Sequence, residues 1–146
     1  SFGSKADLAL GVAEGLQTEQ IAALGNRVRG VASPDDVLEH VRAWAVEANE
    51  SGWVRFELEL LLDTIGDSRL AAAQTARQSA AVTQAAMVVR SLVMTEGLDD
   101  ETLETLAEAA VDYAIGVAIR QVTNRDASPD RFLRLIGPLI AALGRA

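Results

Sequence analysis

Apolar residues recur at the three- and four-residue spacing of an α-helix along most of this 146-residue sequence. We expect six helices, over residues 5–24, 34–48, 53–65, 68–95, 99–123 and 129–143. The third expected helix is apolar around much of its circumference, which is typical of a helix that is buried on more than one side. The pattern as a whole predicts an all-α fold with one core.

Cap residues support the starts of several of these helices. Ser33 precedes Pro34, so that a side-chain cap is followed by proline at the first helical position. Ser128 and Pro129 repeat this arrangement before the last helix. Asp67 is expected to cap the long fourth helix, which neither proline nor glycine interrupts.

The fourth helix contains an uncharged stretch, residues 78–89, and a helix without charge on any face is normally enclosed by other helices. The stretch holds Thr83 and Gln84, whose polar groups must find partners or face a cavity if they are buried. Together with Met87 they form the kind of mixed face that lines small-molecule sites. Hydrogen bonding within the bundle and contact with a ligand both remain open for Thr83 and Gln84, and Met87 is either a core residue or a pocket residue.

Large side chains on other helices offer further walls for such a site. Trp44 and Phe56 are either core residues or pocket walls, and Tyr113 is either a core residue with a bonded hydroxyl or a pocket residue. His40 is the one histidine, and it lies at the surface or contacts a ligand. The expected ligand-binding residues are His40, Trp44, Phe56, Leu60, Thr83, Gln84, Met87 and Tyr113.

The last two helices would leave apolar surface in contact with water if the chain were a lone monomer. Small residues in the fifth helix permit another helix to approach closely, and the sixth helix has a wide apolar stripe. The simplest partner is the same pair of helices in a second subunit, and the two pairs would form a four-helix bundle at the dimer interface. The expected dimer interface comprises Ala110, Ala114, Val117, Ala118, Phe132, Ile136, Leu139, Ile140 and Leu143.

Composition narrows the possible chemistry. The chain has no cysteine and one histidine, which excludes disulfides, thiolate metal sites and histidine-rich metal sites. We expect no metal, no cofactor and no enzyme activity; the enzyme alternative is a small helical isomerase or hydrolase that uses His40 or Tyr113. No apolar run approaches the ~20 residues that cross a bilayer, so we expect a cytoplasmic protein without membrane contact.

The first residues carry a resemblance to a known family. In the stretch FGSKADL, the residues Phe2, Lys5 and Leu8 occupy the places of an aromatic, a lysine and a leucine that recur where the DNA-binding head ends in the tetracycline-repressor (TetR) family. Ser4 is the expected N-cap of the helix that follows. The order and lengths of the six helices are similar to the family's regulatory domain over essentially the whole chain. The resemblance implies three parts: residues 1–4 as a remnant of a helix-turn-helix head, residues 5–24 as the connecting helix, and residues 25–146 as the ligand-binding and dimerisation domain.

The resemblance also implies a function. Such a domain forms a homodimer, binds a small-molecule effector and thereby releases operator DNA. Lys5 would contact a DNA phosphate, while Phe2 and Leu8 would pack between the head and the connecting helix. The net charge of −8 repels a phosphate backbone, so operator binding would belong to the head. The uncharged inner helix favours an apolar or weakly polar effector, and the alternative function is a helical scaffolding module that binds another protein and no ligand.

Overall fold

The computed structural model describes residues 5–145, and every regular element in this range is helical. The all-α fold is therefore confirmed, and Phe2 and Ser4 lie outside the described residues. The elements are α1 (Lys5–Val28), α2 (Pro34–Glu50), α3 (Trp53–Asp63), α4 (Ser68–Ser91), the short 3₁₀ helix η1 (Val93–Thr95), α5 (Asp100–Gln121) and α6 (Asp130–Gly144).

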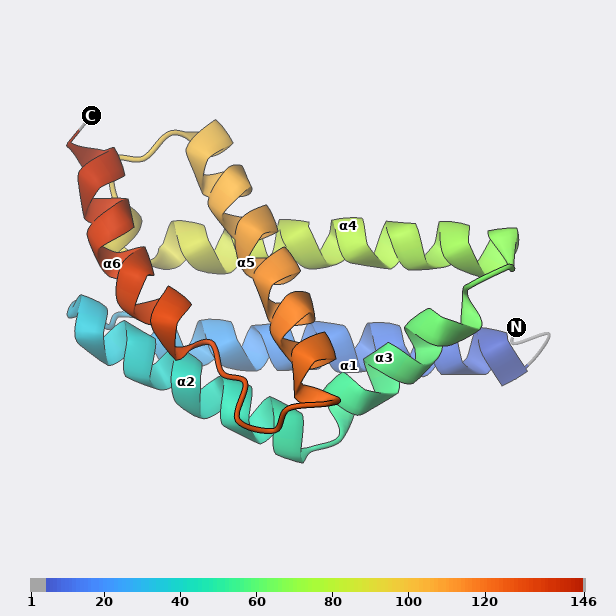
Figure 1. The fold of residues 1–146 in the computed structure, drawn as a ribbon. Coiled ribbons are helices and arrows are strands. Elements are labelled where there is room, and N and C mark those ends of the chain that lie inside the picture. The colour runs from blue at the N-terminus through green and yellow to red at the C-terminus, as the bar shows by residue number, and fades with distance from the viewer. Residues whose placement is uncertain (1–4, 146) are drawn as a thin grey trace.

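The long helix α4 is the centre of the arrangement. It packs against α1, which runs beside it in the same direction, and against α5, which crosses it (Figure 1). The shorter helices α2 and α3 pack against α1, and α6 packs against α2 and η1. The contact between α1 and α4 positions the functional site described below.

Two of the expected helix starts are confirmed by cap geometry. At the start of α2, the Ser33 hydroxyl oxygen accepts a hydrogen bond from the backbone N–H of Asp36 at 3.4 Å. At the start of α4, the Asp67 carboxylate accepts from the backbone N–H groups of Arg69 and Leu70, both at 3.1 Å. Each cap satisfies donors that the first turn of a helix leaves without an intrahelical partner.

The start of the last helix differs from the expectation by one residue. Helix α6 begins at Asp130, and Pro129 takes the cap position without a side-chain cap bond. The Ser128 hydroxyl oxygen instead accepts from the backbone N–H of Asp130 at 3.3 Å. Ser128 thus supports the first turn from one position further upstream.

Helix α1 extends four residues beyond the expected end at residue 24. Val28 is buried in the core, so continuing the helix brings an apolar side chain inside. Gly25 does not interrupt the helix, because it lies where α1 and α4 approach each other; a Cβ atom there would stand 3.4 Å from Cγ2 of Val88. The packing of the two helices therefore overrides the weak helix propensity of glycine.

Helix α4 ends at Ser91, four residues before the expected end at Thr95. Thr95 is buried, and its hydroxyl donates to the backbone carbonyl of Val89 at 2.6 Å and lies 2.9 Å from that of Leu92. A side chain that bonds to nearby carbonyls offers the backbone an alternative to the helix. The chain there turns through η1 instead of continuing α4.

The core consists of aliphatic side chains from all six α-helices, as the low aromatic content predicts. Its members are Ala13, Val28, Val37, Ala48, Leu60, Leu70, Ala86, Leu103, Ala107, Val117, Leu133 and Ile140. No helix within residues 5–145 is long and apolar enough to cross a membrane.

Candidate functional site

A buried arginine stands at the junction of α1, α3 and α4. Arg77 on α4 is only 8% exposed, and its guanidinium makes three side-chain hydrogen bonds. Nη1 donates to Gln74 Oε1 at 3.0 Å, and Nη2 donates to Gln17 Oε1 at 3.1 Å and to Glu57 Oε1 at 2.5 Å. These partners supply the acceptors that a buried cation needs.

The same cluster ties three helices together. Gln17 on α1 returns a hydrogen bond from its Nε2 to the backbone carbonyl of Arg77 at 3.2 Å. The Glu57 carboxylate on α3 also accepts from the indole N–H of Trp53 at 3.0 Å. Trp53 in turn lies edge-on to Trp44 of α2, with ring centroids 6.2 Å apart. A substitution at Arg77 would therefore remove hydrogen bonds to α1 and α3 as well as within α4.

The pKa of Glu57 shows which physical effect dominates in the cluster. Burial raises the pKa of the Glu57 carboxyl group above its ordinary value, and the charge of Arg77 together with the hydrogen bonds from Trp53 and Arg77 opposes this rise. Glu57 keeps 22% of its side chain exposed, so the ion pair is close to solvent at one side. Together, the carboxylate and the guanidinium carry no net charge.

A groove of about 580 Å³ runs between α1 and α4 beside this cluster. Both helices contribute one face to it, and its apolar part is made of small residues and one leucine. The lining residues are Asp7, Leu10, Gly11, Glu14, Gln17 and Thr18 from α1, and Arg69, Ala73, Ala76, Arg77, Ala80 and Gln84 from α4. At one end, Arg69 donates to Asp7 at 2.6 Å and so bridges the two helices.

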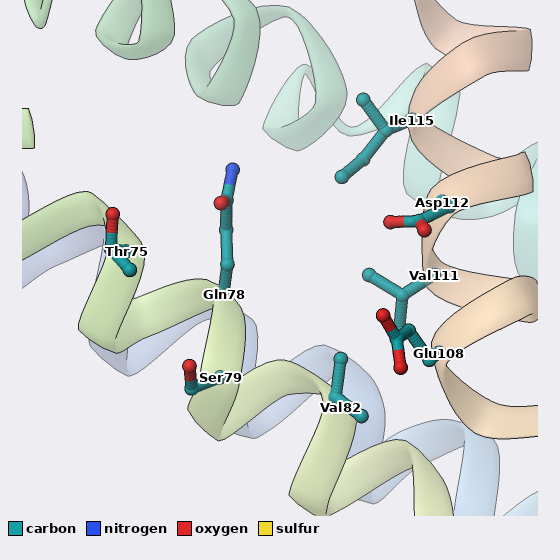
Figure 2. Close-up of a pocket in the computed structure, with 8 residues that line it drawn as sticks. All are labelled: Thr75, Gln78, Ser79, Val82, Glu108, Val111, Asp112 and Ile115. Carbon is teal, nitrogen blue, oxygen red and sulfur yellow. The ribbon is translucent and has the colours of Figure 1, made fainter. Parts of the chain in front are cut away.

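A second groove, of about 400 Å³, lies between α4 and α5. Figure 2 shows Gln78 reaching from α4 into this space, with Val111, Asp112 and Ile115 directed toward it from α5. Glu108 adds a second carboxylate on the same helix, and the other lining residues are Thr75, Ser79 and Val82. The carboxylates of this groove, Glu108 and Asp112, are both exposed to solvent.

The structure does not gather the eight expected ligand-binding residues around either groove. Gln84 is the one that lines a groove, the one between α1 and α4. His40 and Thr83 are exposed, and the Thr83 hydroxyl bonds to the carbonyl of Ser79 in its own helix. Met87 is 66% exposed, because it lies on the outer side of α4.

The remaining expected ligand-binding residues make contacts within the chain. Leu60 is a core residue, 3% exposed. Trp44 is half-buried and donates its indole N–H to the carbonyl of Gln20 at 2.8 Å. Phe56 is half-buried on α3, and Tyr113 stacks on Phe132 with ring centroids 4.2 Å apart.

Sequence reasoning missed Arg77, Gln17, Gln74 and Glu57. In the sequence, Arg77 stands directly before the uncharged stretch. The available signal was the spacing of Gln74, Arg77 and Gln84, which places three long polar side chains on one face of a helix that is otherwise rich in alanine. Nothing in the local pattern shows that Gln17 and Glu57 meet this face.

The expected interface residues fall into three groups: buried, exposed and half-buried. Val117 and Ile140 are buried within the chain itself, so they belong to its interior and not to a free surface. Leu139 and Leu143 are exposed. Ala114 is exposed as well, and the half-buried members are Ala110, Ala118, Phe132 and Ile136.

Three further apolar residues, not expected at an interface, are exposed on the same two helices. They are Ile119, Val122 and Leu135, of which Ile119 lies in α5, Val122 directly follows it, and Leu135 lies in α6. Leu135 and Leu139 are four positions apart, so they lie on one face of α6.

Lys5 is exposed at the first residue of α1. Among residues 5–145, no three histidine, aspartate or glutamate side chains come together as a metal site. No family model matches the chain, and neither the curated proteins nor the solved structures include one that is detectably similar to it.

Proposed function

We propose that this chain is the regulatory domain of a TetR-like DNA-binding transcriptional repressor, which acts as a homodimer, binds a small-molecule effector and then releases operator DNA. The observation that carries the proposal is the groove between α1 and α4, together with the hydrogen bonds between Gln17 and Arg77 at its wall. In such a repressor α1 is the helix that joins the effector site to the DNA-binding head. A ligand in this groove would therefore act directly on the connecting helix.

The mechanism follows from the position of α1. Its contact with α4 depends on hydrogen bonds of fixed geometry, so a molecule that inserts between the helices shifts α1 or changes its tilt. In a dimer, such a shift changes the distance between two heads that must reach major grooves about 34 Å apart. The coupling is reciprocal, and operator DNA weakens effector binding by the same factor by which effector weakens operator binding. The proposal places the protein in the cytoplasm with its operator.

Exposed apolar side chains support the dimer. Ile119, Val122, Leu135, Leu139 and Leu143 are between 38% and 70% exposed at the end of α5 and along α6. If these side chains pack against a second subunit, their apolar surface is removed from water, and this burial stabilises the dimer. We therefore propose that these residues, and not the buried Val117 and Ile140, supply the apolar contacts of the homodimer.

Sedimentation equilibrium tests the dimer. The chain is expected to sediment as a dimer, and the double substitution Leu135→Glu with Leu139→Glu is expected to convert it to a monomer with unchanged helical circular dichroism. Leu62→Glu is the matched control, because Leu62 is also an exposed leucine but belongs to α3 and not to α6. A wild-type chain that is monomeric at all concentrations contradicts the proposal.

The exposed apolar residues also favour a second candidate, a scaffolding module that uses α6 to bind a different protein and has no effector. The two functions differ in what the chain does by itself. A scaffolding module is monomeric until its partner is added, and thermal denaturation does not respond to small molecules. An effector at 100 times its dissociation constant would raise the free energy of unfolding by about 2.7 kcal/mol.

A further inference from the structure

We propose that the groove between α4 and α5 binds an organic ammonium ion, that is, a protonated amine attached to an apolar group. This groove shares no lining residue with the groove between α1 and α4, so the site is separate from the proposed effector site. Two carboxylates without an ion-pair partner among the described residues, and the apolar side chains beside them, define the chemistry of the ligand.

The two carboxylates of the groove repel each other. Glu108 and Asp112 are four positions apart on α5, so they lie on one face of the helix, about 6 Å apart along its axis. Figure 2 shows both side chains on the side of α5 that faces α4. Like charges at this spacing destabilise a helix. An ammonium ion between them replaces the repulsion by two attractions, because its N–H groups donate to carboxylate oxygens on both sides.

Within the described residues, no cation balances this pair. Neither Glu108 nor Asp112 forms an ion pair or a side-chain hydrogen bond with another residue of the range 5–145. The residues that α4 contributes to the groove carry no charge; they are Thr75, Gln78, Ser79 and Val82. Both carboxylates are exposed, so a cation from solution can reach them. A cationic ligand would supply the charge that the lining of the groove lacks.

Apolar side chains beside the carboxylates favour an organic cation over a metal ion. Val82 lines the groove from α4, and Val111 and Ile115 line it from α5. All three are half-buried, so a ligand with an apolar group removes more of their surface from water, which a hydrated metal ion does not. Two carboxylates also fall short of the roughly six to eight oxygen ligands that Ca²⁺ takes. The groove measures about 400 Å³, which is within the range of sites that bind small molecules.

Matched probes can test this chemistry by NMR titration of the isotope-labelled chain at neutral pH. Phenylbutylamine carries both the ammonium group and the apolar group. Phenylbutanol replaces the ammonium group by a neutral hydroxyl, phenylpentanoate replaces it by a carboxylate, butylamine lacks the ring, and calcium chloride offers a cation alone. We expect phenylbutylamine to bind about tenfold more tightly than phenylbutanol or butylamine, and the other two to bind more weakly still. The backbone signals that shift are expected to lie in residues 75–82 and 108–115.

Two double variants separate the groove from the general acidity of the chain. Glu108→Gln with Asp112→Asn is expected to weaken phenylbutylamine about tenfold and to leave phenylbutanol unchanged. Glu101→Gln with Glu104→Gln is the matched control, because it removes the same charge from exposed glutamates of α5 that line neither groove. The control is expected to bind phenylbutylamine as the wild-type chain does. Circular dichroism checks that both variants are folded.

Each other outcome overturns the inference. If phenylbutylamine causes no saturable shifts up to its solubility limit, or shifts only signals outside the two segments, the groove is not the site. If phenylbutanol, butylamine or calcium binds as tightly as phenylbutylamine, the groove does not recognise a charge joined to an apolar group. If both double variants lose the same affinity, the net charge of −8 attracts the amine and the groove does not. None of these results alters the sedimentation test, so a dimer that ignores phenylbutylamine contradicts this inference and leaves the proposed repressor function standing.

Discussion

Gln17 and Arg77 hydrogen-bond to each other twice, through the guanidinium Nη2 to Gln17 Oε1 at 3.1 Å and through Gln17 Nε2 to the Arg77 carbonyl at 3.2 Å. The two residues are 60 positions apart in the sequence. Apolar contacts between helices tolerate small shifts, whereas hydrogen bonds lose strength quickly when distance and angle change. This pair therefore makes the relative position of α1 and α4 specific.

Removing the cation from this cluster should destabilise the chain. We expect Arg77→Met to lower the free energy of unfolding by about 3 kcal/mol, because Glu57 is left largely buried without its counter-charge. The loss lies at the low end for buried ion pairs, since Glu57 is partly exposed. Urea denaturation measures it. The double substitution Arg77→Met with Glu57→Leu is expected to recover most of the loss, and a double variant as unstable as the single one would refute this explanation.

The raised pKa of Glu57 predicts a specific dependence of stability on pH. The folded chain holds the Glu57 proton at pH values where the unfolded chain has released it, so the folded state binds more protons in that window. The free energy of unfolding must then fall as the pH rises from the ordinary glutamate pKa through the raised one. Glu57→Gln cannot titrate, so the stability of the wild-type chain relative to this variant should decline across the window.

Asp99 provides the control of opposite sign. Hydrogen bonds from Thr102, the first of them from its backbone N–H, lower the pKa of the Asp99 carboxyl group. Its contribution to stability is present above the ordinary aspartate pKa and is lost as the pH falls through the lowered one. Relative to Asp99→Asn, the wild-type chain should therefore gain stability with rising pH. Urea midpoints measured from acidic to neutral pH test both slopes, and equal signs would contradict the argument.

Leu60 and Leu62 lie two residues apart on α3 and should respond differently to truncation. Leu60 is 3% exposed and Leu62 is 66% exposed. Leu60→Ala removes a core side chain and leaves a cavity, with an expected loss of about 2–5 kcal/mol. Leu62→Ala should change the free energy of unfolding by less than about 0.5 kcal/mol in a monomeric chain. Thermal or urea denaturation distinguishes them, and a large effect at Leu62 would indicate that its side chain is covered in solution.

The cap of α4 should contribute measurably to stability. The Asp67 carboxylate accepts two backbone hydrogen bonds in the first turn. Asp67→Ala leaves both donors to solvent, and we expect a loss of about 1 kcal/mol. Asp67→Asn keeps an oxygen acceptor in the same place and serves as the control, with little expected change. Comparable losses in the two variants would show that the charge, and not the cap bond, is responsible.

Local patterns in the sequence determined much of the fold. The six helices, the caps at Ser33 and Asp67 and the aliphatic core follow from helical spacing and from residue types within a few positions of one another. Such features depend on one turn of backbone, so they can be recognised without knowledge of distant residues. The ends of α1 and α4 differ from the helical pattern, because Gly25 packs against Val88 of another helix and the Thr95 hydroxyl bonds to the carbonyl of Val89, six positions away.

The tertiary structure alone decided which helix faces meet. The sequence pattern allows Met87 as a core or a pocket residue and indicates Val117 as a dimer-interface residue, yet Met87 is exposed and Val117 is buried within the chain. An apolar residue at helical spacing is consistent with a core, a pocket or an interface, because the pattern defines a face and not what covers it. The same limit applies to the polar cluster. Gln17, Glu57 and Arg77 come from three different helices, and their hydrogen bonds exist only because those helices pack at one place, which no local pattern encodes.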